Sequence, residues 1–133
     1  SFFNIMISDT FGKNDERLKI INVLKNNYKY NRTTKIVSKN LFVNLLNVKD
    51  IIRAIKLIVK RNIKAEKYLI KNNTSYKMID LINTFNKKTN KKIKVKWLSN
   101  KVINENIYTY KKLKGWAPKE SSKIDIIRII QKK

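Results

Sequence analysis

The stretch SDTFGKNDERLKIINVL, residues 8–24, joins an extended apolar run to a segment with helical periodicity and holds one of only two glycines in the chain. Before it, Phe3, Ile5 and Ile7 alternate with Asn4, Met6 and Ser8, which is typical of a strand. Beyond the glycine, apolar residues recur every three or four positions, as on one face of a helix: Leu18, Ile21, Leu24 and Tyr28. The stretch therefore predicts a strand, a turn at Gly12 and a helix from Asp15 to about Tyr28.

The predicted turn has the features of a site for an anionic ligand. Gly12 permits a positive φ or a close approach of the backbone to a ligand. A helix that begins just after it would direct its free N–H groups and its positive dipole end toward the same space. Arg17 and Lys19, in the first turns of that helix, would add positive charge. The alternative is an ordinary strand-to-helix turn with surface charges.

Short strands and helices are predicted to alternate along the rest of the chain. Strands are predicted where apolar residues run together or alternate, at residues 35–46, 67–70 and 93–97. Helices are predicted after residues able to cap them, at Asn47, at Thr74 or Ser75, and at Ser122. The first of these helices is expected to turn one apolar face inward: Ile51, Ile52, Ile55, Ile58 and Val59. The sequence thus predicts one small mixed α/β domain with about four helices and four or five short strands.

Composition excludes several kinds of site. The chain has no Cys and no His, which excludes disulfides, thiol nucleophiles, imidazole bases and the usual zinc sites. No run of about 18 uncharged apolar residues is present, and the first residues, SFFNIMIS, lack a basic region and a small-residue cleavage site. We therefore expect a soluble cytoplasmic chain without a bound metal or a membrane partner.

The net charge of +23 suggests nucleic acid as a partner, because dense Lys and Arg attract phosphate. The excess is almost all Lys, however, and it is accompanied by many Asn and Ile residues. All three have codons rich in A and T, so mutational bias in an AT-rich bacterial genome gives the same composition. The basic residues also form no single block along the sequence. Nucleic acid is therefore not the expected partner, and a basic α/β nucleic-acid-binding module is kept as the alternative interpretation.

Three segments resemble motifs of one enzyme family. DTFGKNDERLKIINVL, residues 9–24, resembles the D/N-x-Y-G-P-x-D-x-R-x-K-L-I pattern of extended short-chain dehydrogenases/reductases, the NAD(P)-dependent sugar-nucleotide epimerases and dehydratases. NLLNVKDIIRAI, residues 44–55, is similar to the family's R-D-x-x-x-V-x-D-x-x-x-A stretch. KLKGWAPKESSKIDIIRII, residues 112–130, is similar to its closing L-G-W-x-P pattern. The three occur in the family's order and together cover nearly the whole chain.

The resemblance implies a C-terminal, substrate-binding portion of such an enzyme. Residues 1–133 would form one substrate-binding domain, with residues 1–12 as the last strand region of a missing Rossmann domain. The chain has no G-x-G-x-x-G fingerprint, so NAD or NADP would be held by the missing half. Tyr108 and Lys112 have the spacing of the family's catalytic pair, but they follow the substrate-binding motifs. We therefore assign no catalytic, cofactor-binding or metal residue and expect no activity from the chain alone.

The resemblance also implies a substrate and the residues that bind it. The substrate would be a nucleotide-diphosphate sugar, and the nearest branch makes deoxysugars for surface polysaccharides. The implied substrate-binding residues are Asp9, Thr10, Gly12, Arg17 and Lys19. The Gly12 turn and Lys19 would hold the diphosphate, with Arg17 as a second cation and Asp9 toward the sugar. The expected partners are thus this substrate, the missing Rossmann domain and, through unpaired apolar residues of the first strand, a second copy of the fragment.

Two departures from the family pattern bear on these roles. Val43 stands where the family has an arginine that reaches the diphosphate, so either another cation substitutes or the substrate class differs. Lys49 replaces the first of two paired acids and leaves Asp50, for which helix capping is the expected role. Arg17 also has an alternative role: it could form an ion pair with Asp15 or Glu105 instead of binding the substrate.

Overall fold

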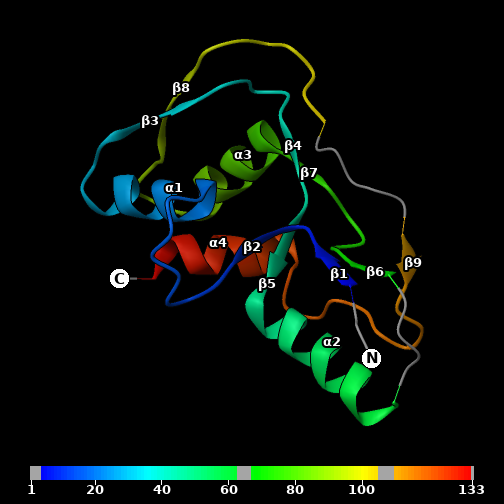
Figure 1. The fold of residues 1–133 in the computed structure, drawn as a ribbon. Coiled ribbons are helices and arrows are strands. Elements are labelled where there is room, and N and C mark those ends of the chain that lie inside the picture. Colours follow the sequence, from blue (N-terminus) through cyan, green and yellow to red (C-terminus); the bar gives the residue numbers. More distant parts are fainter. Residues whose placement is uncertain (1–3, 63–66, 105–109, 133) are drawn as a thin grey trace.

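The computed structural model describes residues 4–62, 67–104 and 110–132 (Figure 1). The helices of this described part are α1 (Ile20–Lys29), α2 (Val48–Lys60), α3 (Met78–Lys88) and α4 (Lys123–Gln131). Its strands are all short: β1 (Asn4–Ile7), β2 (Asp9–Phe11), β3 (Thr33–Ile36), β4 (Phe42–Val43), β5 (Leu45–Asn47), β6 (Lys67–Ile70), β7 (Tyr76–Lys77), β8 (Lys94–Trp97) and β9 (Lys111–Lys112). The predicted small mixed α/β fold with four helices is confirmed.

Most strand pairs in the described residues are parallel. β1, β6 and β9 form a parallel sheet in the order β1-β6-β9, with Ile5 opposite Tyr68. β2 pairs with β5 and β3 pairs with β8, again in parallel, whereas β4 and β7 are antiparallel. Parallel strands need a long connection between them, and α2 leads from β5 of the β2–β5 pair to β6 of the three-stranded sheet.

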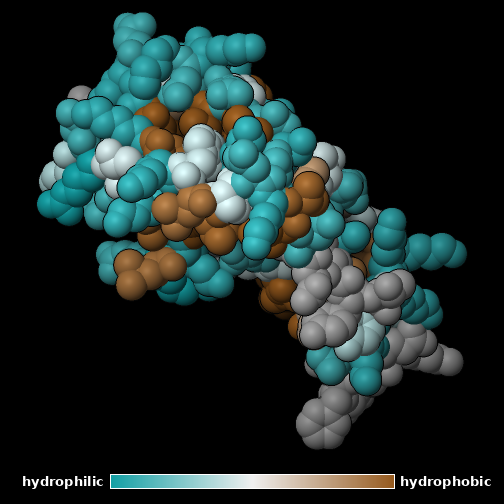
Figure 2. Space-filling view, turned by 90° about the horizontal axis from the view of Figure 1, so that it is seen from above, coloured by the Kyte–Doolittle hydropathy of each residue, from teal (hydrophilic) through white to brown (hydrophobic). Residues whose placement is uncertain are grey.

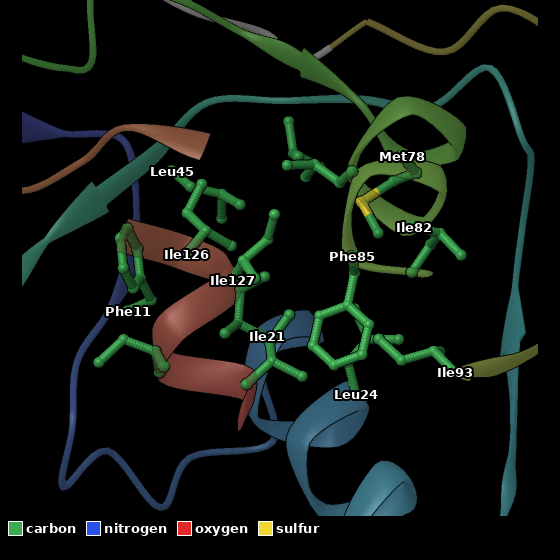
Figure 3. Packing of buried hydrophobic residues seen from close by; sticks show 14 of the residues in the cluster. Phe11, Ile21, Leu24, Leu45, Met78, Ile82, Phe85, Ile93, Ile126 and Ile127 are labelled. Atoms are coloured by element: carbon green, nitrogen blue, oxygen red, sulfur yellow. The ribbon is translucent and has the colours of Figure 1, made fainter. Parts of the chain in front are cut away.

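The buried apolar residues form two clusters. The larger cluster lies between α1, α3 and α4, which are grouped together in Figure 1. Figure 3 shows Phe85 of α3 directed toward Ile21 and Leu24 of α1, and Tyr28 meets the edge of the Phe85 ring at a centroid distance of 4.9 Å. The smaller cluster joins α2 to β1 and β6. Each large apolar side chain buried in these clusters contributes roughly 1.5–3 kcal/mol, so they account for much of the folding free energy.

The first helix begins later than predicted. α1 starts at Ile20 rather than Asp15, and Lys19 is its N-cap residue without a side-chain hydrogen bond to the helix. Leu18, predicted to face the core, is 95% exposed. The physical reason is that Asp15 bonds the backbone N–H and the guanidinium of Arg17, which holds residues 15–17 in a local turn in place of a helical one.

The inward face of α2 is narrower than predicted. Ile51, Ala54 and Ile58 are buried against the sheet, as one face of a helix lying on strands requires. Ile52, Ile55 and Val59 were predicted to point inward as well, but they are 45%, 44% and 75% exposed. At about 100° per residue, the three buried positions cluster on one side of the helix, and Ile52, Ile55 and Val59 lie on the adjacent side. The helix is therefore rotated relative to its apolar stripe, and part of that stripe faces outward.

The helix caps follow the sequence at two of the three predicted positions. Ser122 and Asp125 form a reciprocal capping box at the start of α4, as predicted. Asn47 accepts a hydrogen bond from the Lys49 N–H and caps α2. Thr74 and Ser75 do not cap α3, because β7 intervenes and the helix begins only after Lys77.

Candidate functional site

The candidate site is an open recess of about 510 Å³ at the carboxyl end of β1. Its lining consists of six residues: Ile7, Ser8, Asp9, Thr10, Arg17 and Lys19. Of the five residues predicted from the sequence, four therefore lie around one space. This position agrees with the general rule that α/β sheets bind ligands beyond the carboxyl ends of their strands.

The chain changes sheets at the recess. β1 pairs with β6 up to Ile7, the Ser8 N–H donates to the Ile70 carbonyl, and β2 then pairs with β5 from Asp9 onward. Ser8 therefore lies where the two sheets diverge and leave a space between them. Its Oγ is buried, and among the described residues it has no hydrogen-bond partner. Sequence reasoning did not single out Ser8, although a polar residue directly after an apolar strand was the available signal.

Asp9 and Lys19 form an ion pair across the recess. Lys19 Nζ lies 3.0 Å from Asp9 Oδ1, and the Thr10 N–H donates to the same oxygen at 3.1 Å. Lys19 immediately precedes the first turn of α1, so its ammonium adds to the positive end of the helix dipole. The recess thus combines a cation and a carboxylate that contact each other.

Arg17 is held by Asp15 and Thr10. Its Nε donates to Asp15 Oδ1 at 2.8 Å and its Nη2 donates to Thr10 Oγ1 at 2.6 Å. Hydrogen bonding to this guanidinium lowers the pKa of Asp15 from its usual 3.8 to about 2. Of the two alternative partners named from the sequence, Asp15 is the one observed, and Glu105 lies outside the described residues.

Gly12 does not belong to this recess. It lines a neighbouring one of about 480 Å³ with Lys13, Asp15, Arg17 and Val48, among others. Its φ is not positive, and a Cβ at this position would approach Val48 Cγ2 to 3.3 Å. The glycine therefore allows the backbone to pass close to the start of α2. The prediction that Gly12 and the start of α1 face the same space is wrong, because Gly12 lines the neighbouring recess, whereas Lys19, the N-cap residue of α1, lines the one beyond β1. Arg17 lies between the two recesses.

Asp50 anchors the segment that leads into α4. It is fully buried, its two carboxylate oxygens accept from the Lys119 and Glu120 N–H groups at 2.9 and 3.0 Å, and Ser121 Oγ and Arg53 also contact it. The expected capping role is therefore wrong, because the carboxylate is occupied by residues far away in the sequence. These contacts fix the start of α2, which includes Val48, the residue that lies next to Gly12 in the neighbouring recess.

The described residues offer no other obvious chemistry for a cofactor or metal. They contain no group of three or more Asp and Glu side chains placed to hold a metal ion. Val43 is buried in the larger apolar cluster, so no cation replaces the family's arginine at that position. Neither glycine opens a helix, and a dinucleotide fingerprint is therefore absent from this part of the chain. Tyr108 lies outside the described residues, and no described helix is both long and apolar enough to cross a membrane.

Several solved structures have a similar fold, among them a dTDP-glucose dehydratase and a UDP-glucose epimerase. The dTDP-glucose 4,6-dehydratase (rfbB) of Bacillus anthracis str. Ames in complex with NAD aligns with 96% of this chain at a TM-score of 0.71 and 18% identity. MoeE5 in complex with UDP-glucose and NAD aligns with 96% of this chain at a TM-score of 0.76 and 10% identity. UDP-glucose 4-epimerase of Thermotoga maritima with UDP-glucose aligns with 96% of this chain at a TM-score of 0.69 and 15% identity. No family model and no curated protein sequence matches the chain.

These likenesses establish the fold. The chain adopts a fold found within NAD-dependent sugar-nucleotide epimerases and dehydratases, and nearly all of it takes part in the match. It spans only 42–45% of the length of those three neighbours. At 10–18% identity the likeness does not extend to individual residues, so the roles of Asp9, Thr10, Gly12, Arg17 and Lys19 stay predictions.

Proposed function

We propose that the chain is the substrate-binding portion of an NAD(P)-dependent enzyme that epimerises, dehydrates or reduces a nucleotide sugar. The observation that carries this proposal is the recess beyond β1, where Lys19 and Arg17 provide cations next to the hydrogen-bonding groups of Asp9 and Thr10. A nucleotide sugar needs both kinds of group, because its diphosphate is anionic and its sugar carries hydroxyls. The fold supports the proposal, since two of the neighbours were solved with UDP-glucose.

The Asp9–Lys19 ion pair suggests how the ligand is bound. A diphosphate near the start of α1 competes with Asp9 for the Lys19 ammonium and also meets the positive end of the helix. Asp9 is then free to accept hydrogen bonds from sugar hydroxyls. Arg17, which reaches Thr10 and Asp15 from the same side, is the second cation. Because Val43 provides no charge, Lys19 carries a larger share of the diphosphate interaction.

The dinucleotide does not fit the residues of this chain. Neither glycine lies in a turn that opens a helix, so a backbone cradle for its diphosphate is lacking in the described residues. We propose that a preceding Rossmann domain binds NAD or NADP and provides the catalytic groups. The complete enzyme would act in the cytoplasm, in the synthesis of deoxysugars for surface polysaccharides. The chain alone is then expected to bind nucleotide sugars and to turn over no cofactor.

Titration with UDP-glucose, UDP-glucuronic acid and dTDP-glucose tests the proposal. In ¹⁵N-NMR spectra of the chain, we expect saturable shifts of the Ser8, Asp9, Thr10 and Lys19 amides with at least one of these ligands. Shifts outside the recess, or no saturable binding to any of the three, would overturn the proposal. Reduction of NAD or NADP by the pure chain would show that its catalytic groups are present after all.

A further inference from the structure

The fold brings together two segments that contain no acidic residue. Residues 25–49 contain five Lys and one Arg, residues 81–104 contain seven Lys, and neither segment contains Asp or Glu. β3 belongs to the first of these segments and β8 to the second, and the two strands pair in parallel. Cations that are scattered along the sequence are therefore concentrated on one two-stranded ribbon.

The exposed face of this ribbon carries lysines in register. Lys35 lies opposite Lys96, and Thr33 lies opposite Lys94; all four residues are exposed. The alternate residues of β3, Thr34 and Ile36, are buried on the other face. Neighbouring strands are about 4.8 Å apart, and like charges directly opposite each other are destabilising. A bound anion would turn this repulsion into attraction.

The turns that precede the two strands extend the charged surface. The Lys91 ammonium donates to the carbonyls of Tyr28 and Lys29, so the turn before β8 lies against the turn before β3. Tyr30, 55% exposed, projects from this place, with Lys29 Nζ 5.4 Å and Arg32 Cζ 5.3 Å from its ring centroid. We call this surface the cationic ribbon, and it consists of Lys29, Tyr30, Arg32, Lys35, Lys91, Lys94 and Lys96.

No carboxylate of the described part of the chain neutralises the cationic ribbon. The ion pairs found there use Asp9, Asp15, Asp50, Glu120 and Asp125, none of which pairs with a ribbon residue. Figure 2 looks down on the end of the molecule that carries β3, β8 and α3, and hydrophilic side chains cover most of this face. The ribbon also shares no residue with the recess beyond β1.

We propose that the cationic ribbon binds single-stranded nucleic acid. Exposed lysines at alternate positions of β8, with Lys35 of β3 beside them, suit the regularly repeated phosphates of a linear chain. An exposed aromatic ring among cations suits a stacked base. This combination favours a nucleic acid over an acidic protein or a membrane, because every nucleotide carries both a phosphate for the lysines and a flat aromatic base for Tyr30. The surface is a second site, independent of the sugar-nucleotide site proposed above.

Fluorescence anisotropy with labelled dT20 and U20 at 50–200 mM salt tests the proposal. Comparing the two oligomers shows whether DNA or RNA is preferred. The variant K35Q/K94Q/K96Q removes three ribbon lysines, and K56Q/K60Q/K67Q removes three exposed lysines of α2 and β6. We expect the ribbon variant alone to lower the slope of log K against log salt by about 2, since each lost phosphate contact contributes roughly 0.7 for single strands. Equal losses in both variants would mean that diffuse charge attracts the strand, which would overturn the site.

The aromatic contribution needs its own measurement. Tyr30→Ala is expected to weaken binding of both oligomers about tenfold, as the loss of one stacked base does, and to leave binding of heparin unchanged. Loss of stacking with no effect on UDP-glucose binding would also separate this site from the recess. If Tyr30→Ala changes nothing and heparin binds as tightly as dT20, the ribbon is a general polyanion surface and its assignment to nucleic acid is wrong.

Discussion

Lys19 Nζ lies 3.0 Å from Asp9 Oδ1, so the cation that we assign to a diphosphate is also the partner of a carboxylate. The two side chains are 45% and 26% exposed. Ion pairs with this exposure contribute about 0–1 kcal/mol to stability, because water and salt screen them. The pair can therefore open at little cost when a more highly charged ligand arrives, and opening it releases both partners for the ligand.

Lys19→Ala is expected to weaken the binding of UDP-glucose, or of whichever nucleotide sugar binds, by roughly ten- to hundredfold. A charge-assisted contact of about 1.5–3 kcal/mol is lost, which corresponds to that change in Kd. The fold should be retained, because the Lys19 side chain makes no capping hydrogen bond to α1. Isothermal titration measures the loss, and Lys60→Ala, on an exposed position of α2, is the control. Equal losses in both variants would contradict a specific contact.

Asp9→Asn should have the opposite effect on the diphosphate. The substitution removes the competing carboxylate, so UDP is expected to bind more tightly, by up to about fivefold if the whole ion pair of up to about 1 kcal/mol is released. UDP-glucose should gain less than UDP, because the contact from Asp9 to the sugar hydroxyls is weakened at the same time. The ratio of the two Kd values checks this. An unchanged ratio would place Asp9 away from the sugar.

The Asp15–Arg17 contact predicts a pH dependence at the edge of the recess. Because the pKa of Asp15 is lowered to about 2, its stabilising contact is fully present above about pH 4 and is lost as the pH falls through about 2. A ¹³C-NMR titration of the Asp15 carboxyl should give this low midpoint. Arg17→Gln should raise the midpoint toward 3.8, since the hydrogen-bonding guanidinium is gone. A midpoint that does not move would assign the shift to another group.

Local signals were sufficient to predict much of the fold and part of the site. The capping pair Ser122–Asp125 identified α4, and Asn47 identified α2, since these side chains act on backbone groups a few residues away. The resemblance of residues 9–24 to a family motif singled out Asp9, Thr10, Arg17 and Lys19, which line one recess in the structure. Their roles in binding are not tested by the structure.

The features that could not be predicted depend on long-range contacts. Asp50 was expected to act locally, but it binds residues 119–121, and nothing at short range announces this. Periodicity marked Ile52, Ile55 and Val59 as apolar, but only the position of the sheet decides which of them are covered. The pairing of β3 with β8 likewise joins two acid-free segments that are about 60 residues apart in the sequence.

Self-association is predicted from the apolar residues of the first strand, and the outward apolar surface of α2 offers a second surface for it. Val48, Ile52, Ile55 and Val59 recur along one side of the helix and are all exposed, and exposed apolar stripes of this kind promote association. The net charge of +23 opposes association, so it should strengthen with salt as the repulsion is screened. Light scattering after size exclusion, at low and high salt, tests this, and I52K/I55K should be monomeric in both. A wild-type chain that stays monomeric at high salt would contradict the prediction.

Asp50→Ala should destabilise the chain more than any surface substitution. The carboxylate is fully buried and satisfies the N–H groups of Lys119 and Glu120, the Ser121 hydroxyl and the Arg53 guanidinium. Without it the buried Ser121 hydroxyl and the partly buried groups around it lack a partner, at a cost of about 1–3 kcal/mol for each one that water does not reach, so we expect a loss of about 3 kcal/mol in urea unfolding. Asp80→Ala, at an exposed position of α3, should change stability by no more than about 0.5 kcal/mol. Similar losses in the two variants would show that water replaces the Asp50 contacts, and Asp50 would then not be the anchor of the segment that leads into α4.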